Sequence, residues 1–129
     1  METKSFKQGE IIFSEGTAGT EMYIIKEGSV LVYKTINQEK VELARIKKGS
    51  IVGEMSFFLG HQRTAAVEAT ENTEVMVLDE NSIAAYITNN SKFALTLMRK
   101  LAGRLQNAHK LISQLQGEKT SLEVMYKHK

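Results

Sequence analysis

The sequence has no cysteine and no proline among its 129 residues. Without cysteine, neither a disulfide framework nor a zinc site built on thiolates is possible. No apolar run approaches the roughly 18 to 20 residues that a membrane-spanning helix needs, and no apolar signal segment follows Met1. These absences argue against a disulfide-stabilised domain, a zinc protein with thiolate ligands and a protein with a membrane-spanning helix. They make the cytoplasm the expected location and give no reason to expect a membrane partner.

An excess of charge of one sign is also lacking. Seventeen basic and fifteen acidic residues give a formal net charge of +2. The basic residues are spread along the chain and no recognition helix is apparent, so nucleic acid is not an expected partner. With 42% hydrophobic and 25% charged residues, the composition is typical of a single globular domain with a substantial core.

The first eighty residues have the pattern of a β-protein. Glycines recur there between short runs rich in β-branched and aromatic residues. The runs are EIIF, MYIIKE, SVLVYKTI, VELARI, TAAVEA and EVMVLD. Many short strands separated by glycine turns predict an antiparallel sandwich or barrel. Gly28 is expected to turn a tight hairpin, and Asn37 with Gln38 the next one.

After Asp79 the pattern becomes helical. Residues 80–90 predict a short helix capped by Asp79 or Asn81, and Ser91 is expected to cap a longer helix over 91–116. The apolar residues of the longer helix recur at spacings of three and four: Met98, Leu101, Leu105, Ala108, Ile112, Leu115 and Leu122. Such spacing fits either a coiled-coil seam between two copies or a face packed on the strands. The tail, residues 117–129, is expected to be mobile.

One stretch, GEMSFFLGHQRTAAV from Gly53, places an acid and a base among small and apolar residues. A charge held away from water is costly unless it is paired, so Glu54 and Arg63 need an explanation. Gly53 and Gly60 bracket a run that fits one or two helical turns. A helix N-terminus attracts an anion, and Arg63 supplies a bidentate fork for the same anion. Phosphate is the group that this combination fits.

The acid has a different expected role. Glu54 does not bind phosphate, because like charges repel. A carboxylate beside a phosphate site either accepts a hydrogen bond from a sugar hydroxyl or holds the arginine in place. Phosphate and ribose together indicate a nucleotide. The alternative interpretation is a surface glutamate and a surface arginine that merely flank a loop.

From Phe6 to Leu105 the sequence resembles a cyclic nucleotide-binding domain. This family includes bacterial catabolite activators, the regulatory subunits of cAMP-dependent protein kinase and cyclic nucleotide-gated channels. The resemblance rests on FKQGEIIFSEGTAGTEMYIIKEGSVLVY, on IVGEMSFFLGHQRTAAVEA, which carries the family's phosphate-binding cassette, and on VMVLDENSI followed by LMRKLAGRLQ. It implies an antiparallel eight-stranded β-roll followed by C-terminal helices. The implied domain covers 1–116, with the roll over 1–79, a hinge helix over 80–90 and a long helix over 91–116.

Carried over position by position, the resemblance implies that Glu54 binds the ribose 2′-hydroxyl and that Arg63 binds the cyclic phosphate. Gly53, the backbone N–H groups near Ser56, and Thr64 are expected to line the same pocket.

The sequence also departs from the family pattern. Gln62 stands where the family usually has proline, and Ala66 where threonine is common. On the long helix, the family's base-contacting hydroxyl residues correspond to Ala108 and His109. Asn107, His109 or Lys110 could replace them, and Asn107 and His109 are the two predicted to contact the base.

The expected function is to bind cAMP or cGMP as a regulatory ligand, with cAMP slightly favoured, and to relay the event to a separate effector protein. Thr64 permits cGMP without requiring it. The resemblance also favours a parallel homodimer through the long helix. The alternative is an interaction module of the same fold that has lost its ligand.

Catalysis and metal binding are not expected. The sequence has no nucleophile elbow and no Walker A loop. Its three histidines are far apart, and no His-x-His occurs.

Overall fold

A computed structural model describes residues 2–116 of the chain. The strands are β1 (Thr3–Phe6), β2 (Ile11–Phe13), β3 (Glu21–Glu27), β4 (Ser29–Ile36), β5 (Glu39–Lys47), β6 (Ile51–Val52), β7 (Ala66–Ala69) and β8 (Thr73–Asp79). The helices are α1 (Glu54–Leu59), α2 (Ile83–Asn89) and α3 (Ser91–Leu115). The chain forms two compact units that divide after Tyr86, and each is described by itself.

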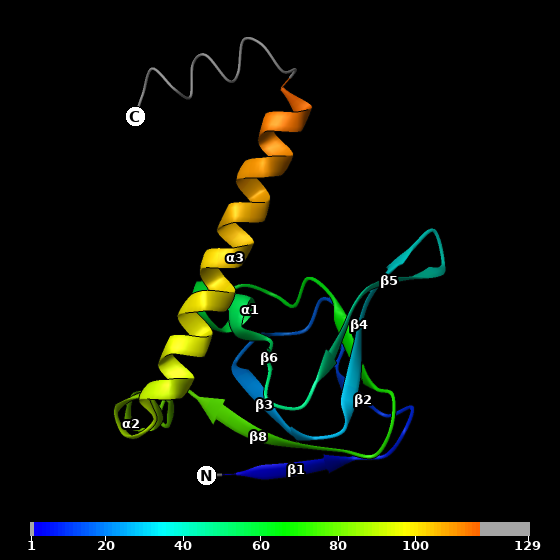
Figure 1. The fold of residues 1–129 in the computed structure, drawn as a ribbon. Helices are drawn as coiled ribbons and strands as arrows, with labels where there is room; N and C mark the ends of the chain where they lie inside the picture. The colour runs from blue at the N-terminus through cyan, green and yellow to red at the C-terminus, as the bar shows by residue number, and fades with distance from the viewer. Residues whose placement is uncertain (1, 117–129) are drawn as a thin grey trace, which may run out of the picture. The chain divides into compact units, whose positions relative to one another are not determined.

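The first unit is built from two four-stranded sheets, ordered β1-β8-β3-β6 and β2-β7-β4-β5. Figure 1 shows β3 and β8 of the first sheet on one side of this unit and β4 and β5 of the second sheet on the other. Every pairing is antiparallel. The core contains side chains from both sheets: Tyr23, Ile25, Val52, Val75 and Val77 from the first, and Val30 and Val67 from the second. Burial of these apolar side chains between the sheets stabilises the roll. The predicted eight-stranded antiparallel β-roll followed by helices is confirmed.

Two of the strands were not expected from their local sequence. β1 is the polar segment TKSF, which forms an edge by pairing with β8. β6 has two residues and pairs with β3 through Val52 and Tyr23. Neither segment has enough alternating apolar residues to predict a strand. Their partners elsewhere in the chain decide their conformation.

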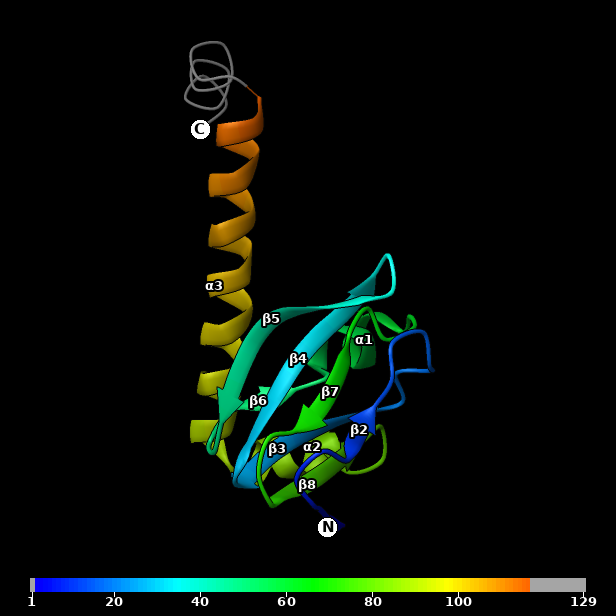
Figure 2. The same cartoon turned by 90° about the vertical axis from the view of Figure 1, so that its right-hand side faces the viewer.

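The prediction of a hairpin at Gly28 is wrong. The strands on either side of it lie in different sheets, so Gly28 forms a corner between them (Figure 2). Its φ of +90° is the positive value expected. A Cβ there would also clash with Thr73 Oγ1 and with the carbonyl oxygen of Asn72. The glycine is required by a close approach as well as by a turn.

The hairpin predicted at Asn37 and Gln38 is confirmed. Both residues have positive φ, 53° and 68°, and they join β4 to β5 with Ile36 opposite Glu39. Positive φ at both central residues is the geometry of the tight turn that matches strand twist.

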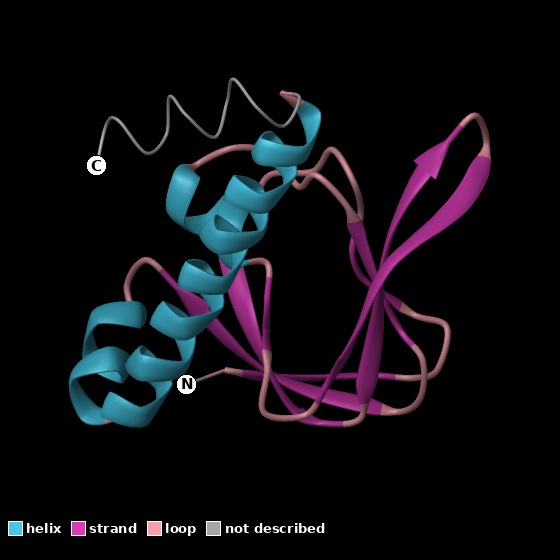
Figure 3. Cartoon of the chain, turned by 45° about the horizontal axis from the view of Figure 1, so that its top comes forward, coloured by secondary structure: helices cyan, strands magenta, loops and turns pink. Residues whose placement is uncertain are grey.

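Apart from α1, the helices follow the last strand (Figure 3). The Asp79 carboxylate accepts hydrogen bonds from the backbone N–H groups of Asn81 and Ser82, each at 3.0 Å, and so fixes the turn before α2. The cap of α3 is Asn90 and not Ser91, because Ser91 is already helical. The predicted mobile tail and Leu122 lie outside the described residues. Within residues 2–116, no helix is long and apolar enough to cross a membrane.

Candidate functional site

The local frame of the site is α1 with a glycine at each end. Gly53 precedes the helix with a φ of +81°, and Gly60 ends it with a φ of +70°. The Gly60 N–H donates to the Ser56 carbonyl at 2.9 Å. The short helix predicted between these glycines is therefore confirmed. It has only six residues, so anion binding here has to rest on side chains and not on a helix dipole alone.

The Arg63 side chain is only 4% exposed and is held by hydrogen bonds. Its Nη1 donates to the Gly53 carbonyl at 2.9 Å and to Ser56 Oγ at 2.7 Å. Its Nη2 donates to the Glu21 carbonyl at 2.6 Å. The Arg63 backbone is also fixed: its N–H donates to the Thr17 carbonyl and its carbonyl accepts from the Gly16 N–H, both at 2.8 Å. The loop before β3 and the cassette therefore position this residue together.

The guanidinium retains hydrogen-bonding capacity. An arginine has five N–H groups, and three of those of Arg63 are used by the bonds above. The Nε group makes no hydrogen bond to any residue that the structure describes. The Nε–H therefore remains to donate to an anion. A buried donor in this state is expected to have a partner, because leaving it unsatisfied is costly.

Glu54 lies at the start of α1 and is 2% exposed. Burial lowers the pKa of the Arg63 guanidinium from its ordinary value. The negative charge of Glu54 acts in the opposite direction, as do Tyr23 and Glu21. The interpretation of Glu54 and Arg63 as two surface charges is wrong, because both side chains are buried.

The structure brings together four of the predicted site residues: Gly53, Glu54, Ser56 and Arg63. Ser56 takes part through its hydroxyl, which accepts a hydrogen bond from Arg63, whereas its backbone had been expected to contribute. Thr64 follows Arg63 with an exposed side chain.

The two candidates for contacting the base are in the second unit. Asn107 and His109 lie on α3 with exposed side chains. Their contact with a nucleotide base stays a prediction.

Sequence reasoning missed the residues that support the arginine. Phe13 and Tyr23 occur in apolar strand runs, where the pattern indicates core packing and nothing else. Gly19 is one of several glycines between the predicted strands, and the sequence pattern does not distinguish it from the others. A Cβ at Gly19 would lie 2.5 Å from Ser56 Cβ and 2.9 Å from the His61 carbonyl oxygen. Glycine is therefore needed there so that the loop can approach the cassette.

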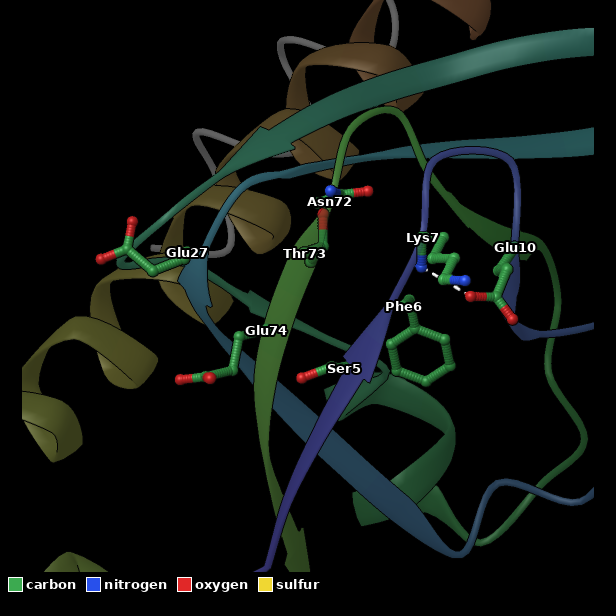
Figure 4. Close-up of a pocket in the computed structure, with 8 residues that line it drawn as sticks. All are labelled: Ser5, Phe6, Lys7, Glu10, Glu27, Asn72, Thr73 and Glu74. Carbon is green, nitrogen blue, oxygen red and sulfur yellow. Dashed lines mark hydrogen bonds between the residues drawn. The ribbon is translucent and has the colours of Figure 1, made fainter.

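Elsewhere in the first unit lies a hollow of about 380 Å³, whose lining residues differ in chemistry from those around Arg63 (Figure 4). Its lining includes the carboxylates of Glu10, Glu27 and Glu74 but only one amine, that of Lys7. Such a lining disfavours a phosphate group, since like charges repel. Within residues 2–116, no group of three or more His, Asp or Glu side chains is placed to hold a metal ion. The expectation of no metal stays a prediction.

Comparison with known families agrees with this fold. Residues 3–90 match the family described as the cyclic nucleotide-binding domain. The chain belongs to this family, which confirms the resemblance carried by the cassette. The cyclic AMP receptor protein of Thermus thermophilus is 29% identical over 127 residues, covering 98% of this chain and 59% of that protein. The chain thus spans little more than half the length of this relative.

Solved structures show the same likeness. The catabolite activator protein of Thermus thermophilus superimposes with a TM-score of 0.78 at 29% identity, covering 89% of this chain and 55% of that one. The EAL enzyme Bd1971 in its cAMP-bound form gives a TM-score of 0.63 at 33% identity, covering 88% and 31%. Its cGMP-bound form gives 0.62 at 34% identity, covering 81% and 28%.

Proposed function

We propose that this chain binds a cyclic nucleotide as a regulatory ligand, with Arg63 on the cyclic phosphate and Glu54 on the ribose 2′-hydroxyl. The observation that carries the proposal is the buried Arg63 guanidinium, whose Nε makes no hydrogen bond within the described chain. A cyclic phosphate is singly charged and presents two exocyclic oxygens, which are suitable acceptors for the remaining Nε–H and partners for the positive charge. The proposed role of the chain is to bind the nucleotide without catalysis. The cytoplasm stays its predicted location.

cAMP is the favoured ligand and cGMP the second candidate. Similarity to a protein named as a cyclic AMP receptor supports cAMP. The similar EAL enzyme Bd1971 has both cAMP-bound and cGMP-bound forms, so the fold accommodates either base. Calorimetric titration of the chain with each nucleotide tests the proposal, and tighter binding of cAMP is expected. Binding of neither nucleotide would favour the alternative, an interaction module that keeps the fold without the ligand.

We also propose that nucleotide binding is transmitted through the C-terminal helices to a separate effector protein. The helix that carries Glu54 also presents Phe57, Phe58 and Leu59 to a hollow of about 520 Å³. Glu80, in the segment before α2, and Ile83, the first residue of α2, line the same hollow. A ligand that repositions α1 therefore acts directly on this segment. Ligand binding shifts such an equilibrium only through contacts that differ between the two states.

Hydrogen exchange measures this relay. Saturating cAMP is expected to change amide exchange over residues 80–116 and to leave β1 unchanged. The Arg63→Ala variant serves as the control, because it is expected to lose the ligand and with it the change. Unchanged exchange over 80–116 in a chain that binds cAMP would show that the nucleotide is structural and not a signal.

The proposed homodimer uses the apolar stripe of α3. Met98 is 60% exposed and Leu105 61% exposed, and Ile112 and Leu115 are also exposed. Together with Leu101 and Ala108 they recur at a and d positions, as in a parallel coiled coil. Burial against a second copy would remove this stripe from water.

Sedimentation tests the dimer. The double variant Leu101→Glu/Leu105→Glu is expected to be monomeric at concentrations where the parent is dimeric, because two carboxylates per helix would meet across an apolar seam. Gln106→Glu is the matched control, since it adds a charge to the same helix at an exposed position outside the stripe. A parent chain that sediments as a monomer at high concentration would contradict the proposal.

A further inference from the structure

The guanidinium of Arg63 lies over two aromatic rings, those of Phe13 and Tyr23. Its Cζ is 4.1 Å from the centroid of the Phe13 ring and 5.8 Å from that of Tyr23. The two rings stack with centroids 5.9 Å apart and an interplanar angle of 25°. A guanidinium over the face of an aromatic ring is attracted by the negative face of the π-system, and the attraction increases when water is excluded. Arg63 is buried, so this condition is met.

The cassette backbone leaves room for the same group. A Cβ at Gly53 would lie 2.8 Å from Arg63 Nη1 and 3.2 Å from Phe13 Cε2. The absence of a side chain at Gly53 therefore lets the backbone, the guanidinium and the Phe13 ring come together. Phe13 belongs to β2 and pairs with Val67 of β7, with a shift of register between Ile11 and Phe13, so the sheet places its backbone beside the cassette.

Tyr23 is tied to the same assembly. Its hydroxyl donates to Glu21 Oε1 at 2.8 Å, while the Glu21 carbonyl accepts from Arg63 Nη2 at 2.6 Å. Burial, with the neighbouring Glu21 carboxylate, raises the pKa of Tyr23 to about 12, so the phenol stays protonated at neutral pH. The second ring is thus held by a hydrogen bond whose phenol donor stays protonated over the physiological pH range.

We propose that Phe13 is a positioning residue of the nucleotide site, which holds the Arg63 guanidinium so that its Nε–H is ready for the cyclic phosphate. The inference rests on the proposed function. Three hydrogen bonds and one ring fix the guanidinium before the ligand arrives. Ordering a free arginine side chain during binding would otherwise cost conformational entropy, and a group that is already ordered avoids this loss.

Substitution of the ring tests the role. Phe13→Leu keeps an apolar side chain but removes the π-face, and it is expected to weaken cAMP binding by about 3- to 10-fold. Phe13→Tyr keeps the ring and is expected to bind within about 2-fold of the parent. Stepwise fluorination of the Phe13 ring weakens its negative face at nearly constant size. It should therefore reduce the affinity in steps while the thermal midpoint of the ligand-free protein changes little.

Phe6→Leu is the matched control. Phe6 packs on the same core cluster as Phe13, so the loss of packing is similar, and it is expected to leave the cAMP affinity unchanged. The positioning role is overturned if Phe13→Leu binds cAMP as tightly as Phe6→Leu, or if fluorination leaves the affinity constant. If the parent binds neither cAMP nor cGMP, the proposed function itself fails, and the role of Phe13 fails with it. The two failures are thus distinguishable from the parent titration alone.

Discussion

Arg63→Ala is expected to lower the affinity for cyclic nucleotide by about 10²- to 10³-fold, which corresponds to roughly 3–4 kcal/mol. The physical reason is that the phosphate would enter a buried site without its counter-charge. Arg63→Lys is expected to recover only part of this loss, because an ammonium keeps the charge but not the planar fork. Calorimetry or competition with a labelled nucleotide measures the effect.

The control for Arg63 is Arg45→Ala. Arg45 is exposed and pairs with Glu42 at 3.0 Å, so its removal takes away an arginine of little energetic weight. The thermal midpoint of Arg63→Ala is measured in parallel, since the variant also leaves the Gly53 and Glu21 carbonyls without a donor. An Arg63→Ala protein that is folded and binds as tightly as the parent would show that the phosphate site lies elsewhere.

Glu54→Gln is expected to weaken binding of cAMP by about 10- to 100-fold. The substitution keeps the shape of the side chain but replaces a charged acceptor, and hydrogen bonds to charged groups contribute about 1.5–3 kcal/mol. The partner of this bond is predicted to be the ribose 2′-hydroxyl. 2′-Deoxy-cAMP should therefore bind weakly to the parent and lose little further affinity on Glu54→Gln, so that the two changes are not additive.

The control for Glu54 is Glu74→Gln, which neutralises an exposed carboxylate of the other hollow and should leave binding unchanged. Full additivity of Glu54→Gln with the 2′-deoxy ligand would contradict the ribose assignment. A loss of thermal stability that accounts for the loss of affinity would instead give Glu54 a structural role.

Local sequence was a good guide wherever it constrains backbone dihedral angles. The Asn37-Gln38 turn and the glycines at both ends of α1 were all predictable, because positive φ restricts which residues fit. The short edge strand β1 and the two-residue β6 were not predictable from their own residues, because only their partners make them strands. The Gly28 hairpin failed for a related reason, since the pattern locates a turn but not the sheet that each strand joins.

The candidate site was also predictable only in part. The cassette motif identified Glu54 and Arg63 as a pair of charges that needs a polar partner. It gave no sign that Arg63 would lie over Phe13, fifty residues earlier in the chain. Nor did it show that Ser56 would lie so close to Gly19 that no Cβ fits there. Contacts between residues so far apart arise when two sheets close on a shared core, and no local periodicity records them.

By itself, then, the sequence determined an antiparallel β-structure followed by helices, the short helix between Gly53 and Gly60, and the presence of an acid and a base in the cassette. These features depend on the order of polar and apolar residues and on the conformational freedom of a few glycines. Only the tertiary structure decided which strands share a sheet, that both charges are buried, and that the Nε–H of Arg63 remains for a ligand. The reason is that burial and hydrogen-bond partners depend on the packing of residues distant in sequence.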